Sequence, residues 1–247
     1  MYMIDTHVHL TWDDYTDLPG LIQRAKEVGV DRFVVPGLDL ASSKRAIALS
    51  DQYPEIIPAI GLHPESPDED LDAFRALAHD PRVKAIGEIG TDAKSGDMAL
   101  QEKRFRFFLD LAVETNKPAL IHIRDTWEPT FAILRDYPQL QNKAVIHCFT
   151  GGKNEAAQIR ELGFFVSVTA ILARPALTES CAVIADWPLD RLMLETDGPF
   201  LAWPGEKWPN EPKTVAQIAQ LVADLKGLSV DDVAQTTTRT AETFFNL

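Results

Sequence analysis

The chain has 247 residues, of which 45% are hydrophobic, and its formal net charge is −13 with a pI near 4.8. This length is normal for one α/β barrel, and the apolar fraction permits a large buried core. The acidic sequence offers no basic face of the kind that grips duplex DNA through its phosphates, and its simplest consequence is solubility. Any phosphate-bearing substrate would need bound metal to supply much of the local positive charge.

Cysteine usage and the N-terminal residues indicate the compartment. Cys148 and Cys181 are far apart and form no CxxC pattern, which argues against a disulfide framework and suits a reducing compartment. Residues 1–10 contain two histidines and an aspartate and lack a long apolar stretch, so neither a signal peptide nor a membrane span is expected there. We therefore predict a cytoplasmic protein that does not use a membrane, and the sequence indicates no obligate protein partner.

Short apolar segments of β-rich composition recur along the chain. Near-continuous apolar runs of this length are typical of buried parallel strands. We predict eight strands, over Met3–Val8, Phe33–Pro36, Ile57–Leu62, Val83–Ile89, Ala119–Ile123, Ala144–His147, Phe164–Val168 and Arg191–Glu195.

Amphipathic segments separate these strands, with apolar residues at helical spacing. The predicted helices cover Leu18–Val28, Ala41–Gln52, Leu71–His79, Gln101–Thr115, Thr126–Tyr137, Lys153–Leu162, Ala176–Ala185, Thr214–Leu225 and Val230–Phe244. Ser229 is the expected N-cap of the last helix. The alternation predicts an α/β protein, a single-domain (β/α)8 TIM barrel over residues 1–247. A doubly wound open sheet is the alternative, but the sequence lacks the glycine-rich phosphate loops, GxGxxG or GxxxxGK[ST], that would support it.

Polar residues at the predicted strand ends are the candidate site, because side chains at the carboxyl ends of barrel strands face the active site. His7 and His9 close the first strand, two residues apart, so they share a face and could hold one metal ion. A hydrogen-bonded pair of polar residues at a strand end is the alternative. His122 and His147 end the fifth and sixth strands and offer one imidazole each.

Carboxylates complete this candidate set. Glu88 interrupts an apolar strand, where a carboxylate is costly unless it is paired or binds metal, and its two oxygens could bridge two cations. Asp197 falls where the chain leaves the eighth strand, so it could ligate metal and take a proton from water, or simply form a turn before Gly198. Glu195 lies two residues deeper in that strand, and its role is left open.

Two further side chains are candidates for substrate binding. Arg124 shares a face with His122 and could bind an anionic substrate oxygen or neutralise a buried carboxylate. His63 ends the third strand, where it could contact substrate or support the metal ligands.

Imidazole-rich sites suit Zn, Mn, Ni, Co or Fe better than Ca. The cofactor prediction is therefore two divalent metal ions, with Zn, Mn, Mg, Ni or Co as candidates.

The ordered motifs resemble those of the TatD-like metal-dependent deoxyribonucleases of the amidohydrolase superfamily. The matching segments are DTHVHL at 5–10, GLHP at 61–64, GEIG at 87–90, IHIRD at 121–125, HCFTG at 147–151, ETDGPFL at 195–201 and NEP at 210–212. The resemblance runs from residue 4 to about 245, which is nearly the whole chain. Three departures, at Thr91-Asp92-Ala93, Pro209 and Thr240, remove no metal ligand.

The resemblance implies a TIM barrel that holds two divalent metals. By analogy with the family, His7, His9 and Asp197 would hold one metal, His122 and His147 the other, and Glu88 would bridge them. Superfamily relatives often bridge their metals with a carboxylated lysine, so a glutamate in the fourth strand favours the TatD-like branch.

The leading functional prediction is a phosphodiesterase, a deoxyribonuclease acting on single-stranded DNA or nucleic-acid ends. Asp197 would orient the attacking water or accept its proton, and Arg124 would stabilise charge on the phosphoryl oxygens. Trp127, Trp203 and Trp208 could stack on bases or pack within loops. The main alternative is hydrolysis of another ester, lactone or amide bond, such as an aminoacyl-tRNA ester. A non-enzymatic binding protein that kept the barrel is opposed by the intact ligand set.

Overall fold

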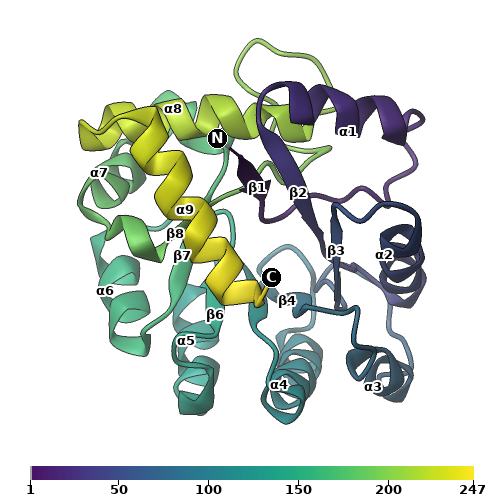
Figure 1. Ribbon diagram of the computed structural model, residues 1–247. Helices are drawn as coiled ribbons and strands as arrows, with labels where there is room; N and C mark the ends of the chain where they lie inside the picture. The colour runs from purple at the N-terminus through teal and green to yellow at the C-terminus, as the bar shows by residue number, and fades with distance from the viewer. Residues whose placement is uncertain (1) are drawn as a thin grey trace. The chain divides into compact units, whose positions relative to one another are not determined.

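The computed structural model describes residues 2–247, so Met1, the first residue of the predicted domain, lies outside the described residues. Strands and helices alternate along this part of the chain (Figure 1). The chain divides into two compact units, each described by itself. Unit 1 comprises Met1–Val35, Cys148–Ala157 and Val166–Leu247, and unit 2 comprises Pro36–His147 and Gln158–Phe165.

Unit 1 is built on two pairs of parallel strands. β1 pairs with β2, and β7 pairs with β8. Helix α9 contacts β1 and β8, and α8 packs against α9 (Figure 1). The elements are β1 (Met3–Asp5), α1 (Leu18–Glu27), β2 (Val30–Val35), β7 (Phe165–Val168), α7 (Thr178–Asp186), β8 (Leu192–Leu194), α8 (Val215–Lys226) and α9 (Val230–Phe245).

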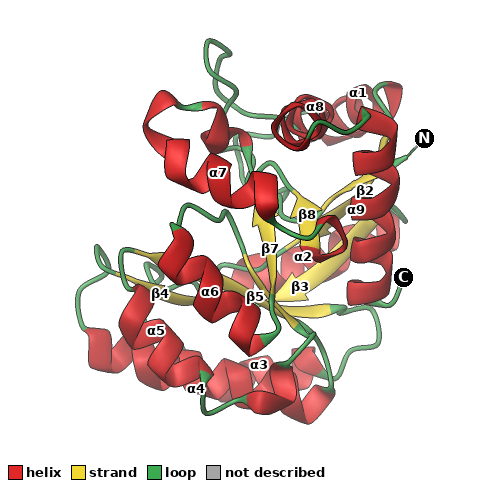
Figure 2. Ribbon diagram, turned by 90° about the vertical axis from the view of Figure 1, so that its left-hand side faces the viewer, coloured by secondary structure: helices red, strands yellow, loops and turns green. Residues whose placement is uncertain are grey.

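Unit 2 contains four parallel strands that pair in chain order, and its helices α3, α4 and α5 lie on one side of β4 and β5 (Figure 2). Its elements are α2 (Leu40–Gln52), β3 (Ile56–Ile60), α3 (Asp72–Ala78), β4 (Ala85–Asp92), α4 (Met98–Thr115), β5 (Ala119–Arg124), α5 (Trp127–Leu134) and β6 (Ala144–Ile146). Helix α6 (Lys153–Leu162) begins in unit 1 and ends in unit 2. Short 3-10 helices cover Pro138–Leu140, Ala170–Ala173, Pro175–Leu177, Leu189–Arg191 and Pro212–Thr214.

Aromatic and branched side chains fill the interior of both units. In unit 2, Phe74 and Phe108 are fully buried and their rings meet edge to face at 5.0 Å. In unit 1, the buried Trp187 donates its indole N–H to the carbonyl of Arg191 at 3.0 Å. All eight residues of β4 are buried, including Glu88, Thr91 and Asp92. The strands are mostly buried, as their near-continuous apolar sequence predicts, and β4 carries three buried polar residues.

Several strand boundaries differ from the prediction. The first strand ends at Asp5 rather than Val8, the third ends at Ile60 rather than Leu62, and the eighth covers Leu192–Leu194 only. The backbone N–H of His7 lies 3.3 Å from a carboxylate oxygen of Asp5, so a side chain replaces the strand ladder there. The fourth strand, by contrast, continues to Asp92. The candidate ligands of unit 1 therefore lie just beyond the strand ends, not within the strands.

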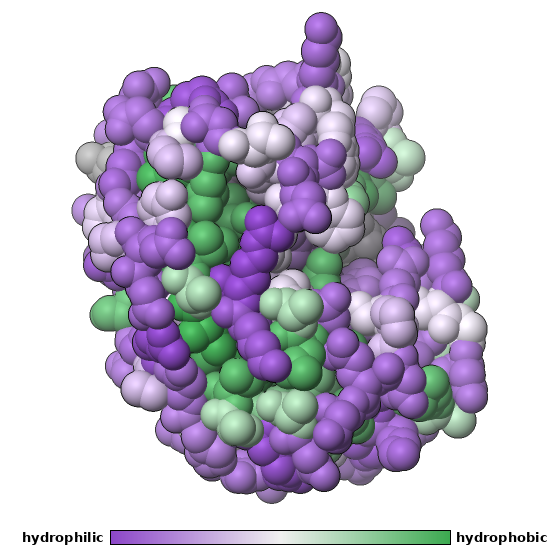
Figure 3. Space-filling view, turned by 90° about the vertical axis from the view of Figure 1, so that its right-hand side faces the viewer, coloured by the Kyte–Doolittle hydropathy of each residue, from purple (hydrophilic) through white to green (hydrophobic). Residues whose placement is uncertain are grey.

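Figure 3 draws one face of the molecule, on which hydrophilic residues surround a region of hydrophobic ones. No helix within residues 2–247 is both long and apolar enough to cross a lipid bilayer.

The predicted cap of the last helix is confirmed and can be tested. The Ser229 hydroxyl accepts the backbone N–H of Asp232 at 3.1 Å at the start of α9. We expect Ser229→Ala to lower the free energy of unfolding by about 1 kcal/mol, because an N–H of the first turn loses its acceptor. Urea unfolding measures the change. Ser229→Asp restores an acceptor and should unfold like the wild type, whereas an equally unstable Asp variant would contradict the capping role.

Candidate metal centre

Unit 1 brings His7, His9 and Asp197 together. The Oδ1 atom of Asp197 lies 3.2 Å from Nε2 of His9 and 3.8 Å from Nε2 of His7. Both histidines are buried, whereas the Asp197 side chain is 16% exposed. The two imidazoles therefore point toward one carboxylate oxygen, which agrees with the predicted common orientation of His7 and His9. They do so even though β1 ends at Asp5, before either histidine.

A buried carboxylate fixes the backbone that carries these three residues. Asp5 accepts hydrogen bonds from the backbone N–H of Thr196 at 2.9 Å and from its hydroxyl at 2.5 Å. Burial raises the pKa of Asp5, and the hydrogen bonds from Thr196 and His7 oppose that rise. The backbone N–H of Asp197 donates to the carbonyl of His7 at 2.9 Å. Residues 5–7 and 196–197 are thereby tied together, which sets the position of the Asp197 carboxylate relative to His7.

Unit 2 brings Glu88, His122 and His147 together in a second group. Oε1 of Glu88 lies 2.8 Å from Nδ1 of His122 and 3.0 Å from Nε2 of His147, and the two nitrogens are 3.3 Å apart. Glu88 comes from the middle of β4, His122 from β5, and His147 from the residue that follows β6. All three side chains are buried or nearly so.

Asp92 supports this group, although the sequence pointed to it only as part of a departure from the family pattern and not as a site residue. Its Oδ2 accepts a hydrogen bond from Nε2 of His122 at 3.0 Å, while Nδ1 of the same ring lies against Oε1 of Glu88. With Nε2 held by Asp92, Nδ1 is the ring nitrogen that would ligate a metal ion. The signal was available in the sequence: Glu88, Gly90 and Asp92 alternate along one strand and share a face. Burial works to lower the pKa of His122, but hydrogen bonds to Asp92 and Glu88 together raise it above its usual value.

Arg124 pairs with the same carboxylate. Its Nη2 lies 2.6 Å from Oδ2 of Asp92 and 2.6 Å from Oε1 of Glu65. Desolvation works to raise the pKa of Asp92, but hydrogen bonds from His122, the Lys94 N–H and Arg124 hold it well below its usual range. Of the two roles considered for Arg124, the structure shows the neutralisation of a buried carboxylate. Its side chain remains 36% exposed.

His63 lies beside the unit 2 group but is oriented as a hydrogen-bond donor. Its Nδ1 accepts the backbone N–H of Glu65 at 3.1 Å, so its proton sits on Nε2, which lies 3.5 Å from Oε1 of Glu88. In this tautomer Nε2 donates toward Glu88, although His63, Glu88 and His122 also lie close enough together to hold a metal ion. This geometry favours a supporting or substrate-contacting role for His63 over metal ligation. The loop after β3, not the strand itself, carries it.

Glu195 also receives a place in the structure. It is buried just after β8, and its Oε1 accepts the backbone N–H of Cys148 at 2.7 Å. Cys148 adopts a left-handed backbone conformation with φ of 49°. Glu195 therefore orders the turn that follows the β6 histidine.

The donor sets fit divalent metal ions. Two ligands about 2.1 Å from a tetrahedral ion stand about 3.4 Å apart. The separations of 2.8 to 3.3 Å in the unit 2 group, and of 3.2 and 3.8 Å in unit 1, are close to that value. Imidazole nitrogens with carboxylate oxygens are the ligands preferred by Zn and related transition metals. The residues present therefore suit metal binding in both units.

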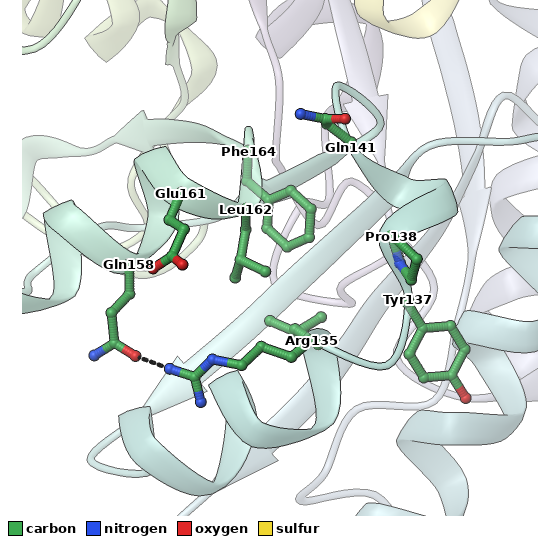
Figure 4. A pocket seen from close by; sticks show the side chains of 9 residues that line it. Arg135, Tyr137, Pro138, Gln141, Gln158, Glu161, Leu162 and Phe164 are labelled. Atoms are coloured by element: carbon green, nitrogen blue, oxygen red, sulfur yellow. Dashed lines mark hydrogen bonds between the residues drawn. The ribbon is translucent and has the colours of Figure 1, made fainter.

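A separate cavity in unit 2 has different chemistry. It measures about 240 Å³ and lies between α5 and α6 (Figure 4). Leu134, Leu162 and Phe164 form its apolar lining, and at its edge Arg135 donates a hydrogen bond to Gln158. Glu161 is the one carboxylate among its lining residues, and histidine and cysteine are absent from that lining. The cavity therefore lacks the ligands that the two groups supply.

Comparisons with known proteins agree with this chemistry. A family model described as TatD related DNase matches residues 4–246. The chain is 34% identical to an uncharacterized metal-dependent hydrolase, YabD, of Bacillus subtilis, with 99% of each chain covered. It is 33% identical to the 3'-5' ssDNA/RNA exonuclease TatD of Erwinia tasmaniensis, covering 99% of this chain and 100% of that one.

Solved structures confirm the fold class. The crystal structure of YjjV, a TatD homologue from Escherichia coli, matches with a TM-score of 0.93 and 29% identity, and the match covers 99% of this chain and 98% of that one. The predicted single (β/α)8 TIM barrel is therefore confirmed, as is the predicted family resemblance. With two groups of imidazole and carboxylate ligands on that fold, the chain belongs to the TatD family of metal-dependent hydrolases.

Proposed function

We propose that the chain is a two-metal phosphodiesterase that hydrolyses single-stranded DNA or the ends of nucleic-acid strands. The observation that carries this proposal is the pair of imidazole–carboxylate groups with metal-ligand spacing. One ion would be held by His7, His9 and Asp197, and the other by Glu88, His122 and His147. The sequence-based prediction that Glu88 bridges both ions stays a prediction.

Divalent ions bound there would supply the positive charge that activates water and stabilises a phosphoryl oxygen. The chain's own residues supply the proton transfer. Oδ1 of Asp197 faces the two histidines, so its other oxygen, Oδ2, would accept the proton of the attacking water. The partial exposure of Asp197 suits contact with water, whereas Glu88 is almost fully buried and suits a ligand.

Arg124 and His63 would contact the substrate. One nitrogen of Arg124, Nη2, is engaged by Asp92 and Glu65, and the side chain is still 36% exposed. Part of the guanidinium would therefore be accessible to a phosphate oxygen. The Nε2–H of His63 would donate to another oxygen of the substrate. The names of relatives lend support: the Erwinia protein is called a 3'-5' ssDNA/RNA exonuclease.

Hydrolysis by the metal-loaded protein tests the proposal. Purified protein loaded with Mn²⁺ or Zn²⁺ should cut single-stranded oligonucleotides, and EDTA should abolish the cutting. Asp197→Asn should lower kcat by roughly 10²- to 10⁴-fold, because the amide cannot accept the proton. Gel analysis of end-labelled strands measures both effects. Asp186→Asn, a change at an acidic residue in α7, is the matched control and should cut like the wild type.

Three outcomes would contradict the proposal. Strands left intact by metal-loaded protein would exclude the nuclease activity. Cleavage of carboxylic esters, lactones or aminoacyl-tRNA esters under the same conditions would assign the site to the alternative that the net charge of −13 favours. Activity unchanged by EDTA would exclude the metal mechanism itself.

The stoichiometry of bound metal gives an independent test of the ligand groups. We expect two divalent ions in the wild type and about one in His7→Ala or His122→Ala, because each variant loses a ligand from one group only. Elemental analysis after gel filtration measures the content. Equal loss of both ions in either variant would contradict separate groups.

Asp92 is expected to control metal affinity through His122. Asp92→Asn removes the carboxylate that fixes the Nε2 proton of His122, and loss of such a partner typically weakens metal binding by roughly 10- to 100-fold. Competition with a chromophoric chelator measures the affinity. Asp125→Asn, an exposed change in the adjacent loop, is the matched control and should bind as the wild type does. Unchanged affinity in Asp92→Asn would show that the hydrogen bond does not orient a ligand.

A further inference from the structure

A row of aromatic rings leads outward from the ligands of unit 1. The ring of Phe200 lies 6.0 Å from that of His9, 5.2 Å from that of Trp12 and 5.5 Å from that of Trp208, measured between centroids. All three contacts are edge-to-face. We call Trp12, Phe200 and Trp208 the aromatic row.

Backbone hydrogen bonds connect two members of the aromatic row to candidate metal ligands. The N–H of Trp12 donates to the carbonyl of His9 at 2.9 Å, and the N–H of Phe200 donates to the carbonyl of Asp197 at 2.9 Å. Each aromatic residue thus follows a candidate ligand by three positions across one hydrogen-bonded turn. The position of the aromatic row is therefore coupled to the position of the ligands.

Trp208 is exposed although its loop is anchored. Its side chain is 52% exposed. Two residues later, the buried Asn210 donates its amide to the carbonyls of Thr196 and Leu201 at 3.1 and 3.3 Å, and its backbone carbonyl accepts the Tyr15 hydroxyl at 2.5 Å. The indole ring of Trp208 is therefore exposed to solvent, whereas these hydrogen bonds hold the backbone of its loop in place.

The other two tryptophans considered for base stacking lie outside the aromatic row. Trp127 begins α5 in unit 2, where its ring lies 5.8 Å from that of Phe131. Trp203 lies in the same loop as Trp208 but is half-buried. Trp208 therefore combines exposure with a ring connection to a candidate ligand.

We propose that Trp208, backed by Phe200 and Trp12, is the stacking platform for an unpaired nucleobase beside the phosphodiester that is cut. Every nucleobase has a π-face, so an exposed indole binds single strands with little sequence preference. In a protein of net charge −13, stacking supplies affinity that phosphate attraction does not. This inference rests on the proposed nucleic-acid substrate and adds the residue that recognises it.

Paired substrates separate stacking from other roles of Trp208. One substrate is a single-stranded oligodeoxyadenylate, and the other is a strand of equal length with the same phosphates and abasic sugars. Loss of one stacked base corresponds to a change of roughly 5- to 150-fold. We therefore expect Trp208→Ala to raise KM for the base-bearing strand by a factor in this range, with a smaller change in kcat. KM for the abasic strand should stay that of the wild type.

Conservative and matched variants complete the experiment. Trp208→Phe retains an aromatic ring and should recover most of the loss. Leu228→Ala removes another exposed apolar side chain, one outside the aromatic row, and should change nothing. The ratio of the Trp208→Ala and wild-type KM values should hold between about 50 and 200 mM salt, because stacking carries no counterion release. If Trp208→Ala leaves KM for the base-bearing strand unchanged, or raises KM equally for the base-bearing and abasic strands, the inference is overturned.

Equilibrium binding distinguishes failure of this inference from failure of the proposed function. Fluorescence anisotropy of a labelled strand is measured with Asp197→Asn alone and combined with Trp208→Ala. If no strand is cut by the wild type but binding requires both the bases and Trp208, the proposed function fails and the platform stands. If strands are cut while binding ignores Trp208, the platform fails and the proposed function stands.

Discussion

The cost of burying carboxylates is the constraint on which the site depends. Asp5, Glu88, Asp92 and Glu195 are all buried, and an unpaired carboxylate in such surroundings is strongly destabilised. Each one is met by donors: Asp5 by Thr196 and His7, Asp92 by His122 and Arg124, and Glu195 by the Cys148 N–H. Glu88 is surrounded by imidazoles, which is the arrangement that a bound cation would complete.

Some of these carboxylates bind backbone N–H groups, and others bind side chains. Asp5 and Glu195 hold backbone, so they set where the chain turns after β1 and after β6. Asp92 holds a side chain: its Oδ2 accepts a hydrogen bond from Nε2 of His122, while Nδ1 of that ring faces Glu88. The ring of His63 is oriented differently: its Nδ1 accepts a backbone N–H, and its Nε2 is the nitrogen that faces Glu88. The hydrogen-bond partners of the two histidines therefore favour metal ligation by His122 and hydrogen-bond donation by His63.

The acidic surface and the aromatic row give one account of how such a protein could select its substrate. Long-range attraction of phosphates is weak for a chain of net charge −13, so selection depends on contacts made at the site. Trp12 and Phe200 are carried by the same turns that carry His9 and Asp197. A base held against the aromatic row would therefore be positioned relative to the ligands by a few short backbone segments.

The sequence by itself determined the fold class, the family and the candidate ligands. Apolar strand runs alternating with amphipathic helices predict a (β/α)8 barrel, and polar residues in or just after apolar strands must have a compensating partner or ligand. Residue spacing is enough to place His122 and Arg124 on one face of a strand, because strand periodicity is local. His7 and His9 converge on Asp197 although β1 ends before them.

Only the tertiary structure decided the partners and the roles. The pairing of Asp92 with His122 joins residues 30 positions apart, and that of Asp5 with Thr196 joins residues 191 positions apart. The early end of β1, the proton on Nε2 of His63 and the aromatic row follow from such contacts. A hydrogen bond fixes which ring nitrogen is protonated, and its partner is chosen by packing in three dimensions rather than by neighbours along the chain.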